Sequence, residues 1–573
     1  MRSVGIDYPK LATLARCGPG WYKNRIGDRI FELKMPYPDW QRGKSPAKNR
    51  RSRLITGLLA SIFTLMSLSS LSQAAAFSDV STSRVDYQKV IARPKQLCRS
   101  LESLTTAEFT VVSARQEDGM CRVTGVIPRE IRFEVNLPDG WNGRLMMTGN
   151  GGLAGQPLED VAYRKSRQAM LAHGFATAYT DTGHDNRIEA GASFAYRSID
   201  KLIDYGYRAI HLTNLAAKSL IQTYYRRPSK YNYFTGCSNG GRQALMQAQR
   251  FPDDFDGILA GAPANQFTGL KFSQAHRMNA LKGDPLNLAE VKVLAEHIYS
   301  QCDAKDGLSD GLISDPRACD FLPDRDLPRC SASAEDSAAC FDDTEITALS
   351  SFYAPVKVAN KEVYPAFPVG SEAEGNNYGG HILPGWVPWV INPAGRPLLD
   401  VLGSDFFRYI VFVQDDPDYD WSEFDFESEP DNLEFTASVL DATNPDLSAL
   451  KANKGKILSY FGWADPDINP LTAINYHREV DLTVPGDVND FYRLFMVPGM
   501  FHCSGGPGPD SFDAITPLIN WVEKGIAPAQ ITASHIEDSA VQFSRPLCPH
   551  PKVAVYDGVG PTTKASSFRC QNL

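Results

Sequence analysis

The sequence predicts an α/β protein with a largely parallel sheet that is interrupted by a large inserted domain. Short apolar runs bounded by Gly, Pro and Asp recur along the chain, as is typical of buried strands. Helical periodicity over residues 201–225 leads directly into another such run, which indicates a parallel β-α-β unit. The alternation stops after residue 261 and returns at residue 456, and this gap indicates the insertion.

The expected elements divide the chain into three parts. A helix over 241–250 follows the strand that ends at Thr235. Residues 265–455 are rich in Asp, Pro, Gly and Trp and contain few clean periodic runs, so we interpret them as a lid domain. The main domain is then built from 77–264 and 456–573. Its strands are expected at 132–137, 143–148, 174–179, 231–235, 256–261, 456–461 and 492–497.

The N-terminal region has the layout of a secretory signal. Basic residues at 48–53 precede an apolar run from Leu54, and small residues end the segment at Ala76. The alternative is a membrane anchor, but the run is short and broken by serines. We therefore expect a signal peptide over 54–76, a secreted or periplasmic protein, and no stable anchor after cleavage. Residues 1–53 form an extension that such signals lack, and we interpret it as a start assigned too far upstream.

Composition and cysteine content narrow the functional classes. Of the 573 residues, 43% are hydrophobic and 22% charged, and the net charge of −9 is not gathered into runs, which disfavours nucleic-acid binding. The composition carries no signal for an oligomeric state. Loss of the N-terminal region removes Cys17 and leaves ten cysteines with no Cys-x-x-Cys pair, so disulfides are favoured over zinc. Eight of them can form four pairs close in the chain, and Cys237 and Cys503 remain.

The segment Gly236-Cys-Ser-Asn-Gly240 fits the nucleophile-elbow pattern G-x-S-x-G. In this pattern, glycines allow a sharp strand-to-helix turn that exposes the serine hydroxyl. The alternative is a purely structural turn. Because an apolar strand precedes the pattern and a helix follows it, we expect an α/β-hydrolase fold with Ser238 as the nucleophile.

A nucleophilic serine needs a base and an acid, which follow it in this fold in the order acid, then histidine. Asp465 and His502 each lie just after a predicted strand and are our candidates. Asp467 is the competing acid, and we interpret His477 as structural. Cysteines stand directly beside both Ser238 and His502, and a bond between them would join the two loops.

Acyl transfer also requires backbone donors for the oxyanion. The amide of Asn239, which follows the nucleophile, is one candidate. The glycine-rich loop after the strand that ends at Thr148 offers Gly151 and Gly152 as candidates for the second. In isolation that loop would be no more than a turn.

Taken together, the motifs resemble the tannase and feruloyl esterase family, which includes mono(2-hydroxyethyl) terephthalate hydrolases. The resemblance implies a triad of Ser238, Asp465 and His502, a Cys237–Cys503 bridge, and a lid that shapes a pocket for aromatic esters. It also implies disulfides among the neighbouring cysteines Cys98, Cys121, Cys302, Cys319, Cys330, Cys340, Cys548 and Cys570. The matching segments are Gly149-Asn-Gly-Gly152, Thr180-Asp-Thr-Gly-His184, Gly236-Cys-Ser-Asn-Gly-Gly-Arg242, Gly462-Trp-Ala-Asp465 and Phe501-His-Cys503.

The same resemblance implies a structural calcium ion in the lid. Three carboxylates, those of Asp303, Asp306 and Asp310, lie in one glycine-containing loop, and hard oxygen ligands suit Ca²⁺. The family also uses backbone carbonyls at the positions of Leu308 and Leu312. The alternative is a solvated acidic turn.

The lid contains aromatic residues and a cation that would suit an aromatic acid. Trp386, Phe412 and Arg408 are the substrate-binding candidates, although an aromatic cluster is more often packing than pocket. The leading hypothesis is a serine hydrolase for feruloyl, galloyl or similar aromatic-acid esters. The alternatives are a terephthalate monoester hydrolase, with Arg408 meeting the free carboxylate, and a non-catalytic calcium-stabilised binding protein.

Overall fold

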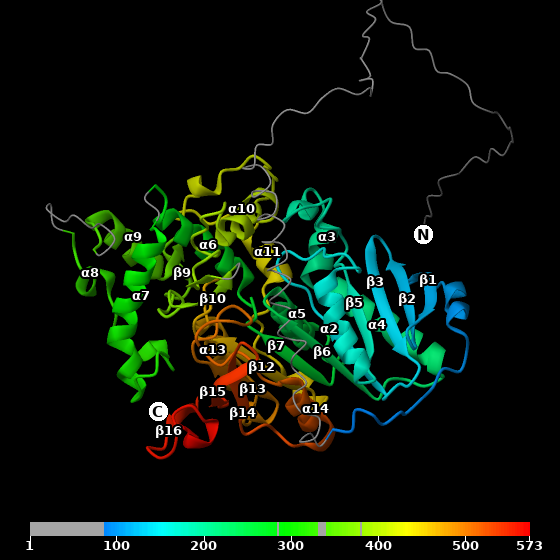
Figure 1. The fold of residues 1–573 in the computed structure, drawn as a ribbon. Helices are drawn as coiled ribbons and strands as arrows, with labels where there is room; N and C mark the ends of the chain where they lie inside the picture. The colour runs from blue at the N-terminus through cyan, green and yellow to red at the C-terminus, as the bar shows by residue number, and fades with distance from the viewer. Residues whose placement is uncertain (1–84, 284–285, 331–339, 379–380, 573) are drawn as a thin grey trace, which may run out of the picture. The chain divides into compact units, whose positions relative to one another are not determined.

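The computed structural model describes residues 85–283, 286–330, 340–378 and 381–572 (Figure 1). The predicted signal segment 54–76 and the extension 1–53 lie outside these ranges. Within them, every helix is too short or too polar to cross a bilayer.

A nine-stranded sheet forms the centre of the fold, in the order β1-β2-β3-β5-β4-β6-β7-β12-β13. The strands from β5 to β13 in this order are parallel, and β1, β2 and β3 add an antiparallel edge. The sheet confirms the α/β class. Its strands are β1 (Thr110–Glu117), β2 (Met120–Ile127), β3 (Ile131–Pro138), β4 (Arg144–Thr148), β5 (Ala176–Thr180), β6 (Tyr231–Cys237), β7 (Gly257–Gly261), β12 (Lys456–Gly462) and β13 (Tyr492–Val497).

All seven predicted strands are present to within two residues, but the β1–β2 hairpin was not predicted. Its two strands are joined by Asp118 and Gly119, both at positive φ. An Asp-Gly pair between strands is a strong hairpin signal, so this element could have been found from the sequence.

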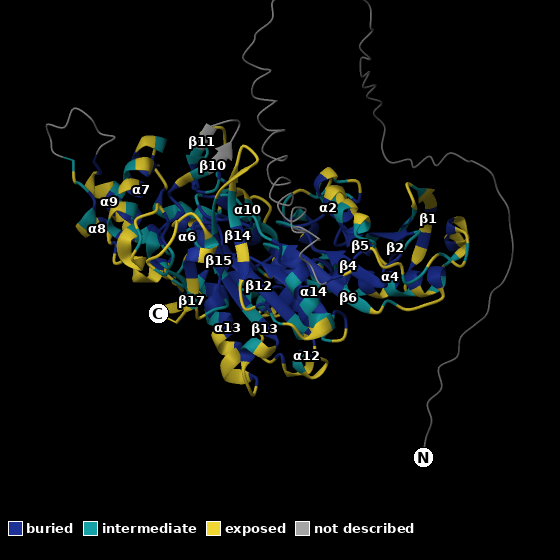
Figure 2. Cartoon of the chain, turned by 60° about the horizontal axis from the view of Figure 1, so that its bottom comes forward, coloured by how far each residue is buried: buried dark blue, intermediate teal, exposed yellow. Residues whose placement is uncertain are grey.

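Helices cover both faces of the sheet, and this explains why the parallel strands β4, β5 and β7 are buried at every position, whereas the edge strand β1 keeps exposed residues (Figure 2). Along β4, Leu145 and Met147 join one core cluster, whereas Met146 joins another on the opposite face. The first cluster includes residues of α4, α5 and α13, and the second includes residues of α2 and α14. The helices outside the insertion are α2 (Val161–Ala172), α3 (Ile199–Ile203), α4 (Ala209–Tyr225), α5 (Asn239–Arg250), α13 (Leu471–Thr483) and α14 (Ile515–Lys524).

The helix predicted over 201–225 is formed by α3, a π-helical turn η4 (Asp204–Arg208) and α4 in direct succession. The turn places the carbonyls of Tyr205 and Gly206 next to α5, where the guanidinium of Arg242 donates to both.

The insertion lies between the adjacent strands β7 and β12 and contains a hydrophobic core cluster of its own, which runs from Leu281 to Leu399. Its helices α7, α8 and α9 appear on the left of Figure 1. The sequence showed little periodicity here because α6 is buried on almost every side, including polar residues such as Lys271 and Gln274. The elements are α6 (Phe267–Ala280), α7 (Leu288–Cys302), α8 (Pro323–Asp326), α9 (Asp343–Tyr353), α10 (Leu398–Tyr409), α11 (Leu433–Leu440), α12 (Ser448–Ala452), β8 (Val356–Val358), β9 (Lys361–Tyr364), β10 (Glu374–Tyr378) and β11 (His381–Pro384).

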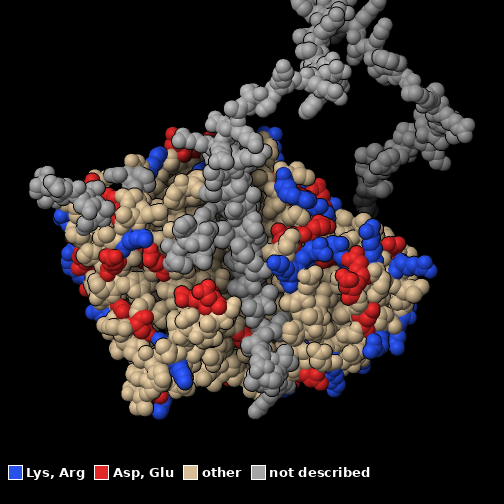
Figure 3. Space-filling view, viewed as in Figure 1, with Lys and Arg blue, Asp and Glu red and all other residues tan. Residues whose placement is uncertain are grey.

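Two small hairpins end the chain and were not predicted. They are formed by β14 (Ile531–Glu537) with β15 (Ala540–Leu547), and by β16 (Val553–Tyr556) with β17 (Phe568–Gln571). On the described part of the face in Figure 3, positive and negative side chains are intermixed. This face therefore offers no extended surface of one sign.

Candidate active site

The turn between β6 and α5 has the geometry of a nucleophile elbow. Ser238 stands at the N-cap of α5 with φ 64° and ψ −125°, a conformation that is costly for a residue with a side chain. Gly236 and Gly240 make the turn possible, since a Cβ on Gly236 would lie 2.5 Å from the backbone of Gly240. The serine remains partly exposed at the positive end of the helix.

Asp465 and His502 form a buried pair beyond the ends of β12 and β13. The His502 Nδ1–H donates to Asp465 Oδ2 at 2.7 Å, which leaves Nε2 as the proton acceptor. The other carboxylate oxygen, Oδ1, accepts the amides of Asp467 and Ile468, at 2.9 and 3.0 Å. Burial disfavours the imidazolium, but the charge and hydrogen bond of Asp465 outweigh this and raise the pKa of His502 above its usual value.

The structure separates the two acidic candidates. Asp467 Oδ1 accepts a hydrogen bond from Gln274 Nε2 at 2.7 Å, so its carboxylate is directed to α6 and not to the histidine. His477 lies buried on α13, where burial lowers its pKa and its ring contacts the carbonyl of Tyr492. Its structural interpretation agrees with this placement.

A disulfide links Cys237 to Cys503, with 6.1 Å between their Cα atoms. The bridge joins the residue before Ser238 to the residue after His502, as expected from the resemblance. In the structure, Ser238 makes no side-chain hydrogen bond to His502 among the described contacts. The neighbouring cysteines are also bonded, in the pairs Cys98–Cys121, Cys302–Cys319, Cys330–Cys340 and Cys548–Cys570.

Loss of the central bridge is expected to cost more stability than loss of a terminal one. The chain-entropy relation gives about 6 kcal/mol for Cys237–Cys503, which spans 266 residues, and about 3 kcal/mol for Cys548–Cys570, which spans 22. Denaturant unfolding of the two double-alanine variants measures the difference. Equal losses in the two variants would contradict the closure of a long loop as the source of stability.

The glycine-rich loop after β4 lies against the elbow. A Cβ on Gly149 would be 3.0 Å from the Cα of Gly240, and the Asn239 side chain donates to the carbonyl of Asn150 at 3.2 Å. Of the two glycine candidates, Gly151 is already engaged, because its amide donates to the Tyr163 hydroxyl at 2.7 Å. Gly152 is therefore the better donor for an oxyanion, together with the first amide of α5, that of Asn239.

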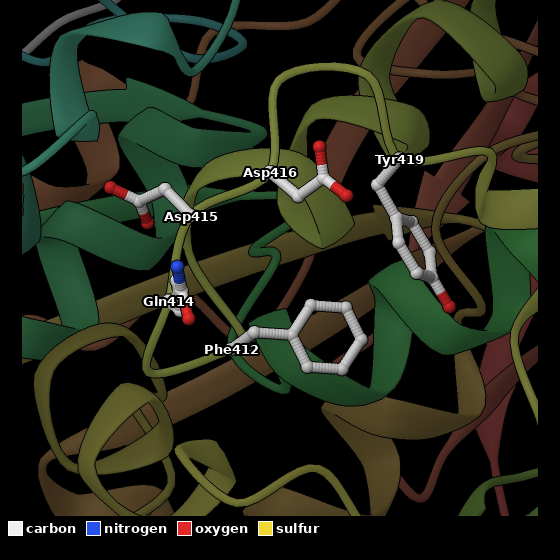
Figure 4. A pocket seen from close by; sticks show the side chains of 5 residues that line it. All are labelled: Phe412, Gln414, Asp415, Asp416 and Tyr419. Atoms are coloured by element: carbon white, nitrogen blue, oxygen red, sulfur yellow. The ribbon is translucent and has the colours of Figure 1, made fainter.

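The substrate-binding candidates in the lid occupy different surroundings. Phe412 lines a cavity of about 420 Å³ together with Gln414, Asp415, Asp416 and Tyr419 (Figure 4). The Arg408 side chain is 27% exposed, and its guanidinium donates to the carbonyl of Tyr419 at 3.1 Å and to Asp405 at 3.4 Å.

Trp386 does not belong to this cavity, and its assignment to the substrate site is corrected. The side chain is fully buried in the lid core, packs against Phe352 and donates to Ser371 Oγ at 2.9 Å. Trp389, three residues later, instead lies edge-on to the ring of His502, with 4.9 Å between centroids. The alternation of buried and partly exposed positions in this turn could not be read from the sequence.

The acidic loop after α7 is held mainly by its own backbone. Asp303 Oδ1 accepts the amides of Asp310, Gly311 and Leu312, and Asp306 Oδ1 accepts that of Leu308. Asp310 pairs with Arg545 of β15. The oxygen donors suit calcium chemically, but among the described residues no three His, Cys, Asp or Glu side chains lie close enough together to hold a metal.

Comparison with known proteins gives a consistent result. The family model for tannase and feruloyl esterase matches residues 117–571. An uncharacterized esterase of Xanthomonas campestris pv. campestris is 34% identical, over 90% of this chain and 94% of its own length. Mono(2-hydroxyethyl) terephthalate hydrolase of Piscinibacter sakaiensis is 32% identical over 78% and 84%. The crystal structure of feruloyl esterase B from Aspergillus oryzae superposes with a TM-score of 0.71 at 27% identity, covering 83% of this chain and 99% of that one.

Proposed function

Because the chain belongs to the tannase and feruloyl esterase family and is a carboxylic ester hydrolase, we propose that it cleaves aromatic-acid esters through Ser238, Asp465 and His502. One observation carries the residue assignment. The buried Asp465–His502 pair is covalently joined, through Cys503 and Cys237, to a serine held in a strained elbow.

The mechanism follows from these positions. His502 Nε2 takes the proton of the Ser238 hydroxyl while Oγ bonds to the ester carbonyl carbon. The amides of Asn239 and Gly152 stabilise the oxyanion. The carbonyl then re-forms, the bond to the alkoxy oxygen breaks, and His502 returns the proton to the departing alcohol. Water repeats the sequence on the acyl-enzyme and releases the aromatic acid.

A substrate panel tests this proposal. Methyl ferulate, methyl gallate and mono(2-hydroxyethyl) terephthalate are offered to the purified protein, and kcat/KM is compared. We expect the highest values for the esters without a free carboxylate. If none of the three esters is cleaved and Ser238 does not react with a fluorophosphonate probe, the proposed hydrolase mechanism is wrong. The non-catalytic binding protein is then favoured.

The terephthalate alternative is favoured by the relative from Piscinibacter sakaiensis and by Arg408. Arg408 donates to the carbonyl of Tyr419 and lies 3.4 Å from Asp405 Oδ1, so its charge is only partly neutralised. Under this alternative, Arg408→Ala lowers kcat/KM for the terephthalate monoester at least tenfold and leaves methyl ferulate unchanged. Arg396→Ala, which removes a lid guanidinium that is 54% exposed, is the control.

We also propose that the acidic loop binds Ca²⁺ through the carboxylates of Asp303, Asp306 and Asp310 and the carbonyls of Leu308 and Leu312. The proposal is supported by hard oxygen donors that lie within ten residues of one loop and by the Cys302–Cys319 bridge that closes this loop. Because no three of the described carboxylates are close enough together in this conformation, the loop would have to tighten around the ion. Asp303 Oδ1 already accepts three amides, whereas Oδ2 accepts only that of Gly311, so Oδ2 is the oxygen of Asp303 with a lone pair left for a cation.

Calcium removal is expected to lower thermal stability. At a free concentration 100-fold above Kd, binding contributes about 2.7 kcal/mol to the folded state, so EGTA should reduce Tm and added Ca²⁺ should restore it. Asp306→Asn is expected to weaken this response, whereas Asp342→Asn, at a helix cap elsewhere in the lid, retains it. A Tm that is indifferent to both EGTA and calcium would rule out the site.

We also propose that the protein is exported. Disulfides of the described residues require an oxidising compartment, and the signal layout of residues 54–76 supplies a route. N-terminal sequencing of the mature protein should begin near Phe77. A mature chain that retains residues 1–53 would contradict this.

A further inference from the structure

The glycine-rich loop that faces the elbow is fixed peptide by peptide. The amide of Asn150 donates to Gln243 Oε1 at 2.9 Å, and the amide of Gly151 donates to the Tyr163 hydroxyl. The carbonyl of Gly152 accepts the Tyr205 hydroxyl at 3.0 Å. Each of these peptide groups therefore has a dedicated side-chain partner.

The peptide group between Gly151 and Gly152 is held through its carbonyl alone. Gln156 Nε2 donates to the Gly151 oxygen at 2.9 Å, and the amide of Ala154 donates to the same oxygen at 3.0 Å. Among the described residues, the N–H of Gly152 has no protein acceptor. The amide of Leu153 also lacks one, but Leu153 is buried, whereas Gly152 is partly exposed. Of these two amides, that of Gly152 is therefore the better placed to donate to a substrate.

We propose that Gln156 is a positioning residue for the oxyanion hole, which it serves by fixing the peptide group whose N–H belongs to Gly152. The proposal rests on the serine mechanism above and adds to it a residue that does not touch the substrate. Donation to a peptide carbonyl fixes the plane of that peptide and polarises its N–H, because hydrogen bonds along one amide strengthen each other. Oxyanion stabilisation depends on such fixed donors.

The other contacts of Gln156 agree with this role. Its Oε1 faces Asn150 Nδ2 at 3.5 Å, so the carboxamide lies with its acceptor towards an amide donor and its donor towards the carbonyl. Asn150 Nδ2 donates in turn to the carbonyl of Thr180 at 2.9 Å, which anchors the arrangement to β5. The donor atom of Gln156 is thus directed to one acceptor, the carbonyl of Gly151.

The decisive variant is Gln156→Met, which keeps the length of the side chain and removes the donor. Loss of a direct oxyanion donor costs roughly 10²- to 10³-fold in kcat, and the bond from Ala154 remains, so we expect roughly a 10- to 100-fold fall. KM should change little. Gln249→Met is the control, because it removes a Gln Nε2 hydrogen bond, to the Tyr476 hydroxyl, at the far end of α5.

Two ligands separate a positioning role from a general loss of structure. A trifluoromethyl ketone adds to Ser238 as a tetrahedral oxyanion, so its affinity should fall by the same factor as kcat/KM. The affinity of the aromatic acid product, which carries no such oxyanion, should stay constant. Equal loss of both affinities, or an unchanged kcat, would overturn the proposal. If Gln156→Met fails to fold, Gln156→Glu keeps the shape, replaces the donor with an acceptor, and is expected to lose at least as much kcat.

The substrate used keeps this test independent of the aromatic specificity. Turnover of p-nitrophenyl acetate requires the oxyanion hole but no aromatic-acid pocket. If the wild type cleaves p-nitrophenyl acetate and no aromatic ester, the proposed substrate class is wrong while the effect of Gln156 is still measured. If the wild type cleaves neither, both proposals fail.

Discussion

Ser238→Ala is expected to lower kcat for aromatic-acid esters by roughly 10⁴- to 10⁶-fold. The variant removes the only atom that would bond to the acyl group, and the remaining oxyanion donors and binding groups retain a small rate above that of water. Initial rates on methyl ferulate, with active sites titrated by a fluorophosphonate in the wild type, measure the difference.

The fold should survive this substitution. Alanine keeps a Cβ at the strained position, and the Ser238 side chain makes no helix-cap hydrogen bond whose loss would destabilise α5. We therefore expect Tm to change little. A variant that retained more than about one-tenth of wild-type activity would exclude Ser238 as the nucleophile, since no covalent route would remain for it.

Asp465→Asn is expected to reduce kcat by about 10⁴-fold, whereas Asp467→Asn should have a far smaller effect. In the first variant the amide oxygen can keep the backbone bonds of Oδ1 and turn its NH₂ towards His502 Nδ1. The histidine then carries its proton on Nε2 and cannot accept the one from Ser238. Asp467 bonds Gln274 instead, so its neutralisation leaves the tautomer of His502 unchanged.

The pH profile gives a second measure of the same contact. Hydrolysis requires neutral His502, so the acid limb of kcat/KM follows its pKa. Asp465 raises that pKa, and the limb of the wild type should lie above the ordinary histidine value of about 6.5. Without the carboxylate charge, the limb of the residual activity should move to lower pH. If the acid limb stays at the same pH in Asp465→Asn, the group that titrates in the wild type is not His502 paired with Asp465.

The candidate active site could be predicted because its signals are local. The strand-glycine-serine-glycine-helix order specifies one turn, and Cys237 and Cys503 mark the nucleophile and base loops within one residue of each. The preference for Asp465 over Asp467 came from the predicted loop position and the family resemblance, since both residues follow the same strand by a few residues. The physical reason appears only in the structure, where Asp465 accepts from His502 and Asp467 accepts from Gln274 on α6, nearly 200 residues earlier in the chain.

In the glycine-rich loop and in the lid, too, the sequence could not distinguish neighbouring residues of the same type. The sequence does not distinguish Gly151 from Gly152 as an oxyanion donor. The structure does, because the amide of Gly151 donates to the Tyr163 hydroxyl. Trp386 and Trp389 belong to one turn, yet one lies in the core and the other beside His502. The hydrophobic pattern of α6 did not predict a helix, because a helix surrounded by protein needs no polar face.

The bridge between Cys237 and Cys503 also sets when the serine loop and the histidine loop can be covalently joined. Three of the other described disulfides, Cys98–Cys121, Cys302–Cys319 and Cys330–Cys340, join cysteines 10 to 23 residues apart and can form before residue 503 has been synthesised. This one must wait until residue 503 has been synthesised and reaches an oxidant. Until then the base loop is not covalently joined to the serine, and a truncated or reduced chain holds its hydrolytic serine without that link. The covalent joining of the two loops is therefore a step that follows synthesis of residue 503 and requires an oxidising compartment.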